Sequence, residues 1–224
     1  MRRVTIRLVA DAALVAILLF SAAGTFAWWR AWVLVAVLFG VRAIGAHAAY
    51  RVNPALLLER TELPIHTEQS QSDRVLLLAV LATGFLGLPV LAALEVFHWH
   101  VWPQPAARLS ATGLVLFALG WSLKCLALRE NAFATAAVRR QRAHAVADTG
   151  VYSVVRHPFY AADPLILVGL GLWLQSFVAV LSAAIPVTLM MIRLHLEERF
   201  LRRELPGYGA YALRVRYRLI PGVW

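Results

Sequence analysis

The chain has 224 residues, of which 61% are hydrophobic and only 15% are charged, and its mean hydropathy is +0.68. This composition excludes an ordinary soluble domain of this size and predicts an integral membrane protein. The formal net charge of +10 does not indicate a nucleic-acid partner, because the arginines flank apolar segments and no DNA- or RNA-binding motif accompanies them. Attraction to the anionic headgroups of membrane lipids explains the charge better.

Four apolar segments each come close to the ~20 residues that a helix needs to cross a bilayer core. In chain order they are residues 8–27, 31–50, 75–97 and 109–128. The first follows basic residues, as in a signal peptide, but its apolar stretch is long and more spans follow, so we expect it to be retained. The sequence therefore predicts an N-terminal region of four transmembrane helices over residues 1–128.

The remaining region, residues 129–224, combines a polar loop, one further apolar run and a basic, amphipathic tail. The apolar run over residues 161–192 is interrupted at Gln175 and Ser176, and Pro164 is expected in its first turn, where a helix tolerates proline. We predict a short helical hairpin with arms of about 24 Å at ~1.5 Å per residue, which is short for a full crossing. The whole chain is then an all-α polytopic membrane bundle of about six transmembrane segments, with amphipathic helices at the cytoplasmic surface and both regions in one integrated domain.

The distribution of arginine predicts the orientation, because lysine and arginine in short loops mark the cytoplasmic side. With six segments and a cytoplasmic N-terminus, only Arg30 and Arg108 fall in outer loops. Tryptophan forms belts at membrane interfaces, and the tryptophans near the expected outer turns are Trp28, Trp29, Trp32, Trp99, Trp102 and Trp173. Both signals place the N- and C-termini in the cytoplasm, and the compact chain is typical of the bacterial inner membrane.

Few residues inside the spans are candidates for chemistry. The one cysteine, Cys125, lies in a span, so neither a disulfide nor a cysteine-based metal site is expected, and we predict no metal. Ionisable groups within a membrane are functional candidates by default. Because Asp11 and Glu95 lie close to the interface, we assign them no role.

Polar and aromatic residues gather at both ends of the predicted hairpin. Residues 152–160 read Tyr-Ser-Val-Val-Arg-His-Pro-Phe-Tyr, and the far arm ends in Arg193-x-x-x-Glu197-Glu198. Groups of this kind are costly to keep at a membrane without a function. Because a tight hairpin returns the chain to the side from which it came, we expect the two groups to meet at the cytoplasmic surface. Arg193 and Glu197 are four residues apart on one helix face, where they can act together or pair with each other.

These residues resemble the isoprenylcysteine carboxyl methyltransferase family of integral membrane enzymes and, more distantly, the phospholipid N-methyltransferases. The resemblance covers roughly residue 131 to the C-terminus, with a weaker likeness at residues 53–60. The matching pieces are His144-Ala-Val-Ala147, Gly150-Val-Tyr152, Arg156-His157-Pro158-Phe-Tyr160, Glu197-Glu198-x-x-Leu201 and Tyr208-x-x-Tyr211-x-x-x-Val215 before Pro221. Where relatives carry a glycine after Arg-His-Pro-x-Tyr, this chain has Ala161-Ala162 and then Asp163, which we expect to be a helix N-terminal charge or an additional contact to a ligand.

The resemblance implies an S-adenosylmethionine site made from the polar loop and the hairpin ends. The cofactor-binding positions that it implies are Gln141, His144, Ala145, Val146, Ala147, Tyr152, His157, Pro158, Phe159, Tyr160 and Glu197. Arg193 matches the substrate-binding arginine, and the implied catalytic residues are Arg193 and His157. A carboxylate such as Glu197 can hold the cofactor's ammonium, and Arg193 can grip an anionic acceptor through two hydrogen bonds.

The expected reaction is methyl transfer to an amphiphilic small molecule, lipid or lipidated acceptor that enters from the membrane. An activated methyl donor leaves the protein mainly positioning and the exclusion of water. The first expected acceptor is a carboxylate of the isoprenylcysteine type, which needs no general base. The second is a phospholipid amine, which must lose a proton, and for this His157 and Glu198 are candidates.

Other interpretations of the same residues stay open at this stage. His157-Pro158 can simply start a helix, Glu197 and Glu198 can be solvated partners of nearby arginines, and Tyr208 and Tyr211 are expected to pack rather than bind ligand. A related C-terminal half occurs in sterol-type double-bond reductases that use NADPH. A non-enzymatic transporter or scaffold is a further alternative, although no internal repeat is evident and the polar groups crowd at one surface.

Overall fold

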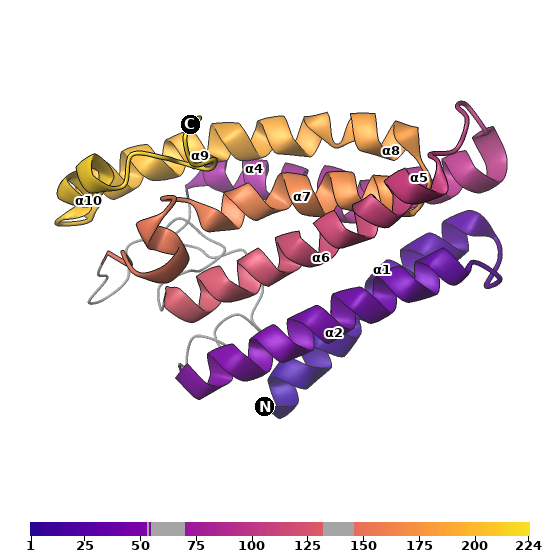
Figure 1. Ribbon diagram of the computed structural model, residues 1–224, viewed down its shortest axis with the longest axis horizontal. Helices are drawn as coiled ribbons and strands as arrows, with labels where there is room; N and C mark the ends of the chain where they lie inside the picture. Colours follow the sequence, from indigo (N-terminus) through magenta and orange to yellow (C-terminus); the bar gives the residue numbers. More distant parts are fainter. Residues whose placement is uncertain (53, 55–69, 132–145) are drawn as a thin grey trace.

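The computed structural model describes residues 1–52, 54, 70–131 and 146–224 (Figure 1). All the regular structure within them is helical, which confirms the predicted all-α bundle. The elements are α1 (Arg2–Ala23), α2 (Trp29–Val52), α4 (Gln71–Val80), η1 (Leu81–Gly87), α5 (Leu88–Leu94), η2 (Glu95–Trp99), α6 (Ala107–Glu130), η3 (Gly150–Ser153), α7 (Pro158–Trp173), α8 (Phe177–Ser182), α9 (Ala184–Glu204) and α10 (Tyr208–Arg214).

Five helices among the described residues are long and apolar enough to cross a membrane. They are α1, α2, Gln71–Trp99, α6 and Phe177–Glu204. The predicted hairpin turn at Gln175 is confirmed, since this residue has the left-handed φ of 65°. The expectation of two equally short arms is wrong, because α8 and α9 join into one long arm. Ala183 links them with a helical φ of −60° and ψ of −21°, and α9 continues to Glu204 beyond the apolar run.

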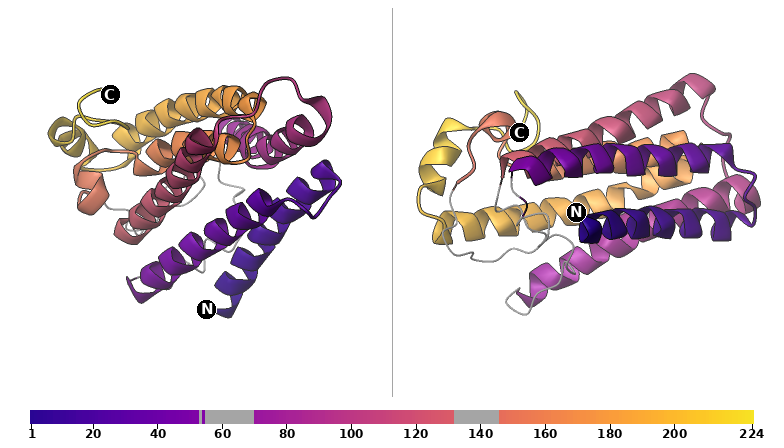
Figure 2. Two further views of the ribbon diagram at one scale, coloured as in Figure 1. Left: turned by 45° about the vertical axis from the view of Figure 1, so that its right-hand side comes forward. Right: turned by 90° about the horizontal axis from the view of Figure 1, so that it is seen from below.

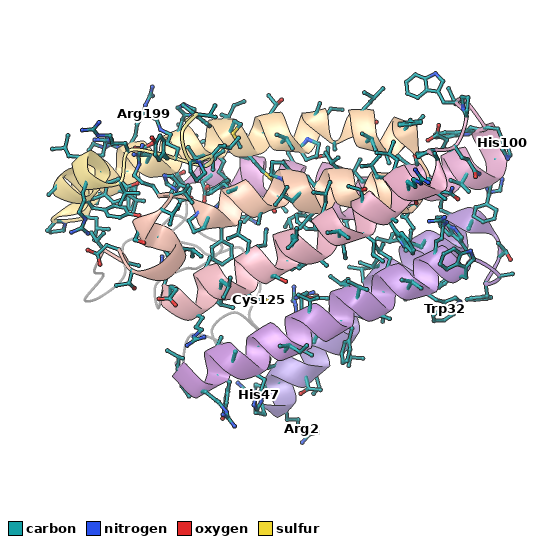
Figure 3. All side chains as sticks on the ribbon, in the orientation of Figure 1. Arg2, Trp32, His47, His100, Cys125 and Arg199 are labelled. Carbon is teal, nitrogen blue, oxygen red and sulfur yellow. The ribbon has the colours of Figure 1, made fainter. Side chains whose placement is uncertain are left out.

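Successive long helices run in opposite directions along the bundle, as Figures 1 and 2 show. Both chain termini lie toward the same end, together with η3, α10 and the end of α9. We call this the site end and the opposite end the far end. In Figure 3 Arg199 marks the site end, whereas Trp32 and His100 lie at the far end. The fold therefore gathers segments that are distant in sequence at one end of the molecule.

Glycines allow α6 and α7 to pack closely. A Cβ atom on Gly113 would lie 2.6 Å from the backbone N of Trp173, and one on Gly169 would lie 2.6 Å from that of Phe117. One on Gly120 would lie 2.9 Å from the carbonyl oxygen of Ala162. Small residues serve this purpose in membrane helix pairs because they let backbones approach. Ala162, the second residue after the Arg-His-Pro-x-Tyr piece, is thus buried against α6.

The far end is held together by aromatic rings around one arginine. The Arg30 guanidinium lies 4.7 Å from the ring centroids of both Trp29 and Trp173, and its Nη1 donates to Ser110 Oγ at 2.6 Å. The indole N–H of Trp173 donates in return to the carbonyl of Arg30 at 2.8 Å. Arg30 therefore belongs to the first turn of α2, where it ties α2 to α6 and α7 rather than lying free in an outer loop.

Two pairs of charged residues lie between the long helices. Arg42 Nη2 of α2 is 2.6 Å from Asp11 Oδ2 of α1, and Lys124 Nζ of α6 forms a close ion pair with Asp163 Oδ1 of α7. The prediction that Asp163 stands in the first turn of a helix is wrong. Because α7 begins at Pro158, Asp163 and Pro164 lie in its second turn. Asp163 therefore balances a cation of the neighbouring helix.

Candidate active site

The loop before α7 is shaped by a glycine and a proline. Gly150 has a φ of 53°, and a Cβ there would lie 2.6 Å from Glu130 Cδ, so the turn that begins η3 requires glycine. His157 is the N-cap of α7 and Pro158 occupies its first position, where a missing backbone N–H costs nothing. His157-Pro158 does start a helix, as one of the two interpretations of this pair proposed, and this placement is compatible with a role at the site. The turn buries Tyr152 of η3 beside this helix start.

The two ends of the hairpin meet through Tyr160. Its hydroxyl donates to Glu197 Oε2 at 2.6 Å and accepts from Arg193 Nη1 at 3.2 Å. Tyr160 is buried in the first turn of α7, while Arg193 and Glu197 share a face of α9. This confirms the expectation that residues of both hairpin ends come together.

Asp73 completes this group and is not among the residues that the sequence predicts for the site. The carboxylate accepts from Arg193 Nε at 2.7 Å and from Nη2 at 3.4 Å. Asp73 is buried in the first turn of α4, whose N-cap Ser70 accepts from the Asp73 backbone N–H at 3.2 Å. The only available signal was an acid at the start of an apolar span. We call Asp73, Tyr160, Arg193 and Glu197 the Tyr160 network.

The Arg193 guanidinium directs a fork of two donors, Nε and Nη2, at Asp73. A guanidinium recognises a carboxylate through two parallel N–H donors, and here Nε and Nη2 both face the same side chain of α4. The sequence predicts that this fork binds an anionic acceptor. In the structure Nε and Nη2 instead donate to a carboxylate of the protein, which holds the guanidinium in place.

His157 is buried beside the Tyr160 network. Its Nε2 lies 3.3 Å from the hydroxyl of Tyr208, and its ring meets the Tyr160 ring edge-on with centroids 6.0 Å apart. Burial lowers the pKa of His157 to about 4, even though the charge of Glu198 acts in the opposite direction. The imidazole is therefore neutral near pH 7 and can accept a hydrogen bond or a proton.

The short helix α10 covers Tyr152 and the loop before it. The Tyr211 hydroxyl donates to the carbonyl of Tyr152 at 2.7 Å, and burial raises the pKa of Tyr211 to about 12. Val146 packs against the small apolar cluster of Leu205, Tyr208, Tyr211, Ala212 and Val215. The expectation that Tyr208 and Tyr211 are packing residues is confirmed, and both also support predicted site residues through hydrogen bonds.

Glu198 binds three arginines and is not a solvated helix residue. Its carboxylate lies 3.0 Å from Nη2 of both Arg156 and Arg202 and 2.6 Å from Nε of Arg218, and only 3% of the residue is exposed. The interpretation of Glu198 as a partner of nearby arginines is confirmed, whereas the exposure to solvent that it assumed is wrong. A carboxylate held by three guanidinium groups is a poor proton acceptor, so the arrangement opposes the general-base role considered for Glu198.

Arg156 extends this cluster to the C-terminal segment. Its Nη1 donates to the carbonyls of Val215 at 2.7 Å and Arg216 at 2.8 Å. The backbone N–H of Arg156 donates to the Tyr217 carbonyl, and that of His157 donates to the Arg218 carbonyl, at 2.9 and 3.0 Å. Residues 215–218 are thereby fixed alongside the start of α7.

The remaining predicted site residues lie in three situations. Pro158 is fully buried at the start of α7, and the half-buried Phe159 ring lies 5.9 Å from Lys124 Nζ. Ala147 is half-buried in the loop before η3. Outside the described residues lie Gln141, His144 and Ala145, together with residues 53 and 55–60 of the weaker likeness.

Part of the chain that carries this site matches a known protein family. Residues 109–206 match the family model described as phospholipid methyltransferase. The matched segment runs from α6 to the end of α9 and includes three of the four members of the Tyr160 network. It supports a membrane methyltransferase in the broad group that also contains the isoprenylcysteine type, and it does not single out that type. No curated protein matches the chain with significance.

Proposed function

We propose that the chain is an S-adenosylmethionine-dependent methyltransferase whose active site is the Tyr160 network with its surroundings at the site end. The observation that carries the proposal is the direct contact of Tyr160 with Glu197 and Arg193, within the segment that matches phospholipid methyltransferases. Buried ionisable groups that converge on one another between apolar helices are strong candidates for a functional site.

The site residues have the chemistry that the cofactor requires. Glu197 Oε2 accepts from Tyr160 at 2.6 Å, which orients the carboxylate and leaves Oε1 for the cofactor's ammonium. Tyr152 and His157 provide an aromatic ring and an imidazole near the start of α7, where adenine and ribose can bind. When bound, S-adenosylmethionine supplies an activated methyl group.

The contacts of Arg193 favour an amine as the acceptor. Its Nε and Nη2 both donate to Asp73, so an anionic acceptor would have to compete with a carboxylate of the protein for these donors. The family model that matches residues 109–206 is also described as phospholipid methyltransferase. We therefore place a phospholipid amine ahead of an isoprenylcysteine-type carboxylate.

The protein's own task in this reaction is to orient the acceptor, exclude water and let one proton leave. The new N–C bond forms as the S–C bond of the donor breaks, and an ammonium acceptor must first lose a proton to expose its lone pair. Neutral His157 can accept a hydrogen bond from the acceptor's ammonium and orient it. Because burial lowers its pKa to about 4, it is a weak base, and the proton leaves to solvent.

We further propose that the site end faces the cytoplasm of a bacterial inner membrane. The arginines of Glu198's cluster, with Arg199 and Arg214, lie at this end, and arginine enrichment marks the cytoplasmic side. The cofactor then reaches the site from the cytoplasm, and an amphiphilic acceptor reaches it from the surrounding lipid.

The decisive experiment combines cofactor binding with product analysis. The purified protein in lipid nanodiscs is titrated with S-adenosylmethionine and, separately, with NADPH. It is then incubated with S-adenosylmethionine that carries a CD₃ group. We expect saturable binding of S-adenosylmethionine and a deuterated methyl group on the amine of an extracted phospholipid by mass spectrometry.

Matched variants identify the site. Glu197→Gln keeps the shape of the side chain but removes its charge, and we expect transfer to fall by about tenfold or more. Glu204→Gln, at the exposed end of the same helix, serves as the control and is expected to behave like the native protein. Binding of NADPH alone would overturn the methyltransferase proposal. A deuterated methyl ester would overturn only the amine assignment.

A further inference from the structure

The proposed transfer leaves Lys124 and Asp163 without a role. They form a close ion pair between α6 and α7, with 17% and 8% of their side chains exposed. Asp163 lies three residues after Tyr160 on α7, so it stands about one turn deeper in the bundle than the Tyr160 network. A charged pair kept inside a membrane bundle is expensive and calls for a functional explanation.

Three aromatic rings surround the Lys124 ammonium. The distances from Nζ to the ring centroids are 5.5 Å for Phe85, 5.8 Å for Trp121 and 5.9 Å for Phe159. The rings come from η1, α6 and α7, so three separate elements converge on one cation. Several aromatic faces around a cation are the arrangement by which proteins recognise quaternary ammonium groups.

Local features on two of these elements support a ligand site. Phe85 lies on η1, a π-helical segment of seven residues, and π-helical turns are frequent at functional sites. The indole N–H of Trp121 is buried without a hydrogen-bond partner among the described residues. Phe85, Trp121 and Phe159 all retain partial exposure, so the group can be reached from outside the bundle.

We propose that Phe85, Trp121, Phe159 and Asp163 form an ammonium cage for the methylated headgroup of the lipid product, and that Lys124 occupies this cage when no headgroup is bound. The inference rests on the proposed function, because a methylated ammonium is the product of amine methylation. Exchange of one cation for another leaves the charge of Asp163 balanced. The flexible four-carbon stem of lysine allows its ammonium to move away toward the interface.

Phe159 connects the cage to the reaction site. It precedes Tyr160 in the chain and is one of the residues implied to bind the cofactor, yet its ring also faces Lys124. A headgroup in the cage is therefore adjacent to the place of methyl transfer. Each added methyl group increases the fit to the rings, so the cage retains a partly methylated lipid beside the site for a further transfer.

The test measures binding without the methyl donor. The full chain is placed in nanodiscs of phosphatidylglycerol that contain a small fraction of phosphatidylcholine labelled with ¹³C in its N-methyl groups. Aromatic rings shift the proton resonance of a methyl group that lies over their faces, so NMR reports on the cage itself. We expect a saturable upfield shift of the N-methyl signal.

Variants separate the cage from an ordinary ion pair. Lys124→Met removes the resident cation and is expected to tighten binding by about three- to tenfold, whereas Phe85→Leu and Trp121→Leu are expected to weaken it by a similar factor. Phe39→Leu removes an exposed ring of α2 and is the control. The Phe85 and Trp121 variants keep the ion pair, so they remain informative if Lys124→Met does not fold.

Two results would overturn the proposal. One is an N-methyl signal that is not shifted or does not respond to Phe85→Leu and Trp121→Leu. The other is a folded Lys124→Met variant that binds no more tightly than the native chain. This binding experiment contains no S-adenosylmethionine, and the methyl-transfer experiment does not measure the NMR shift. A negative result for the cage therefore leaves the methyltransferase proposal standing, and a negative transfer result is recognised separately.

Discussion

Asp73 fixes the orientation of the Arg193 guanidinium within the site. By engaging Nε and Nη2, it leaves Nη1 to contact Tyr160. The hydroxyl of Tyr160 then has one direction in which to donate, toward Glu197. A single buried carboxylate of α4 thus orients three side chains of α7 and α9.

We expect Asp73→Asn to lower the rate of methyl transfer. Asparagine keeps an acceptor but removes the charge that balances Arg193, and the loss of one partner of a buried pair leaves the other uncompensated. The expected loss in kcat is about tenfold or more, with a smaller change in the KM for S-adenosylmethionine, because the change disturbs positioning. Steady-state transfer of a labelled methyl group measures both constants.

The matched control is Asp148→Asn. Asp148 forms an ion pair with Arg214 at the surface, where both side chains are substantially exposed, and such pairs contribute little. This variant should retain native activity. Native kcat in Asp73→Asn would show that the orientation of Arg193 does not matter for transfer.

The sequence could predict only part of this network. The meeting of Tyr160 with Arg193 and Glu197 follows from one hairpin, whose turn is evident from Gln175 and Ser176. Asp73 is 120 residues from Arg193 in the chain, and no local pattern connects them. The burial of Glu198 was likewise unpredictable, because two of its three arginines come from other segments.

At the scale of elements, the contact of α6 with α7 sets the position of the site. α7 has only 16 residues, so it depends on its neighbours more than the longer helices do. Gly113, Gly120 and Gly169 bring its backbone close to α6. The sequence predicts both helices from their apolar patterns, but which glycine faces a neighbour depends on packing that a single chain pattern does not contain.

We expect Gly113→Ala to destabilise the bundle. The added methyl group would lie 2.6 Å from the Trp173 backbone N and 2.8 Å from the Gly169 carbonyl oxygen, so α6 and α7 must separate. Overpacking of this kind costs typically 1–3 kcal/mol, which lowers the Tm measured by thermal unfolding in nanodiscs. Methyl transfer should fall with it because α7 carries Tyr160.

Gly40→Ala provides the comparison. A Cβ at this position meets nothing within 4 Å, and alanine is favoured over glycine inside a helix by about 0.5–1 kcal/mol. Its Tm should equal or exceed that of the native chain. If Gly113→Ala were as stable as Gly40→Ala, the close approach of α6 and α7 would not be required.

For the whole molecule, buried His157 links stability to pH. Its pKa is lowered by burial to about 4, compared with about 6.5 in an unfolded chain. Between these values the unfolded state binds more protons than the folded one, so stability falls as the pH decreases from about 6.5 to about 4. When the pH has fallen through this whole window, the protonation of His157 in the unfolded chain lowers the free energy of unfolding by about 3 kcal/mol.

Thermal unfolding between pH 7.5 and 4 tests this linkage. The Tm of the native chain should decrease through the stated window, and the decrease should be smaller in His157→Gln. The Tyr208 hydroxyl keeps a hydrogen-bonding partner in that variant, so burial of the site is retained. Equal pH dependence in both proteins would assign the acid sensitivity to other groups.

The contacts of Arg156 and Glu198 also impose an order on biosynthesis. Residues 215–218 border the site next to His157, and a ribosome produces them after all the helices described above. The contacts that fix Arg156 and His157 before α7 can therefore form only after α9 has been made. Assembly of the active site is consequently a late event, separate from insertion of the bundle, and defects in the two steps should be separable in the cell.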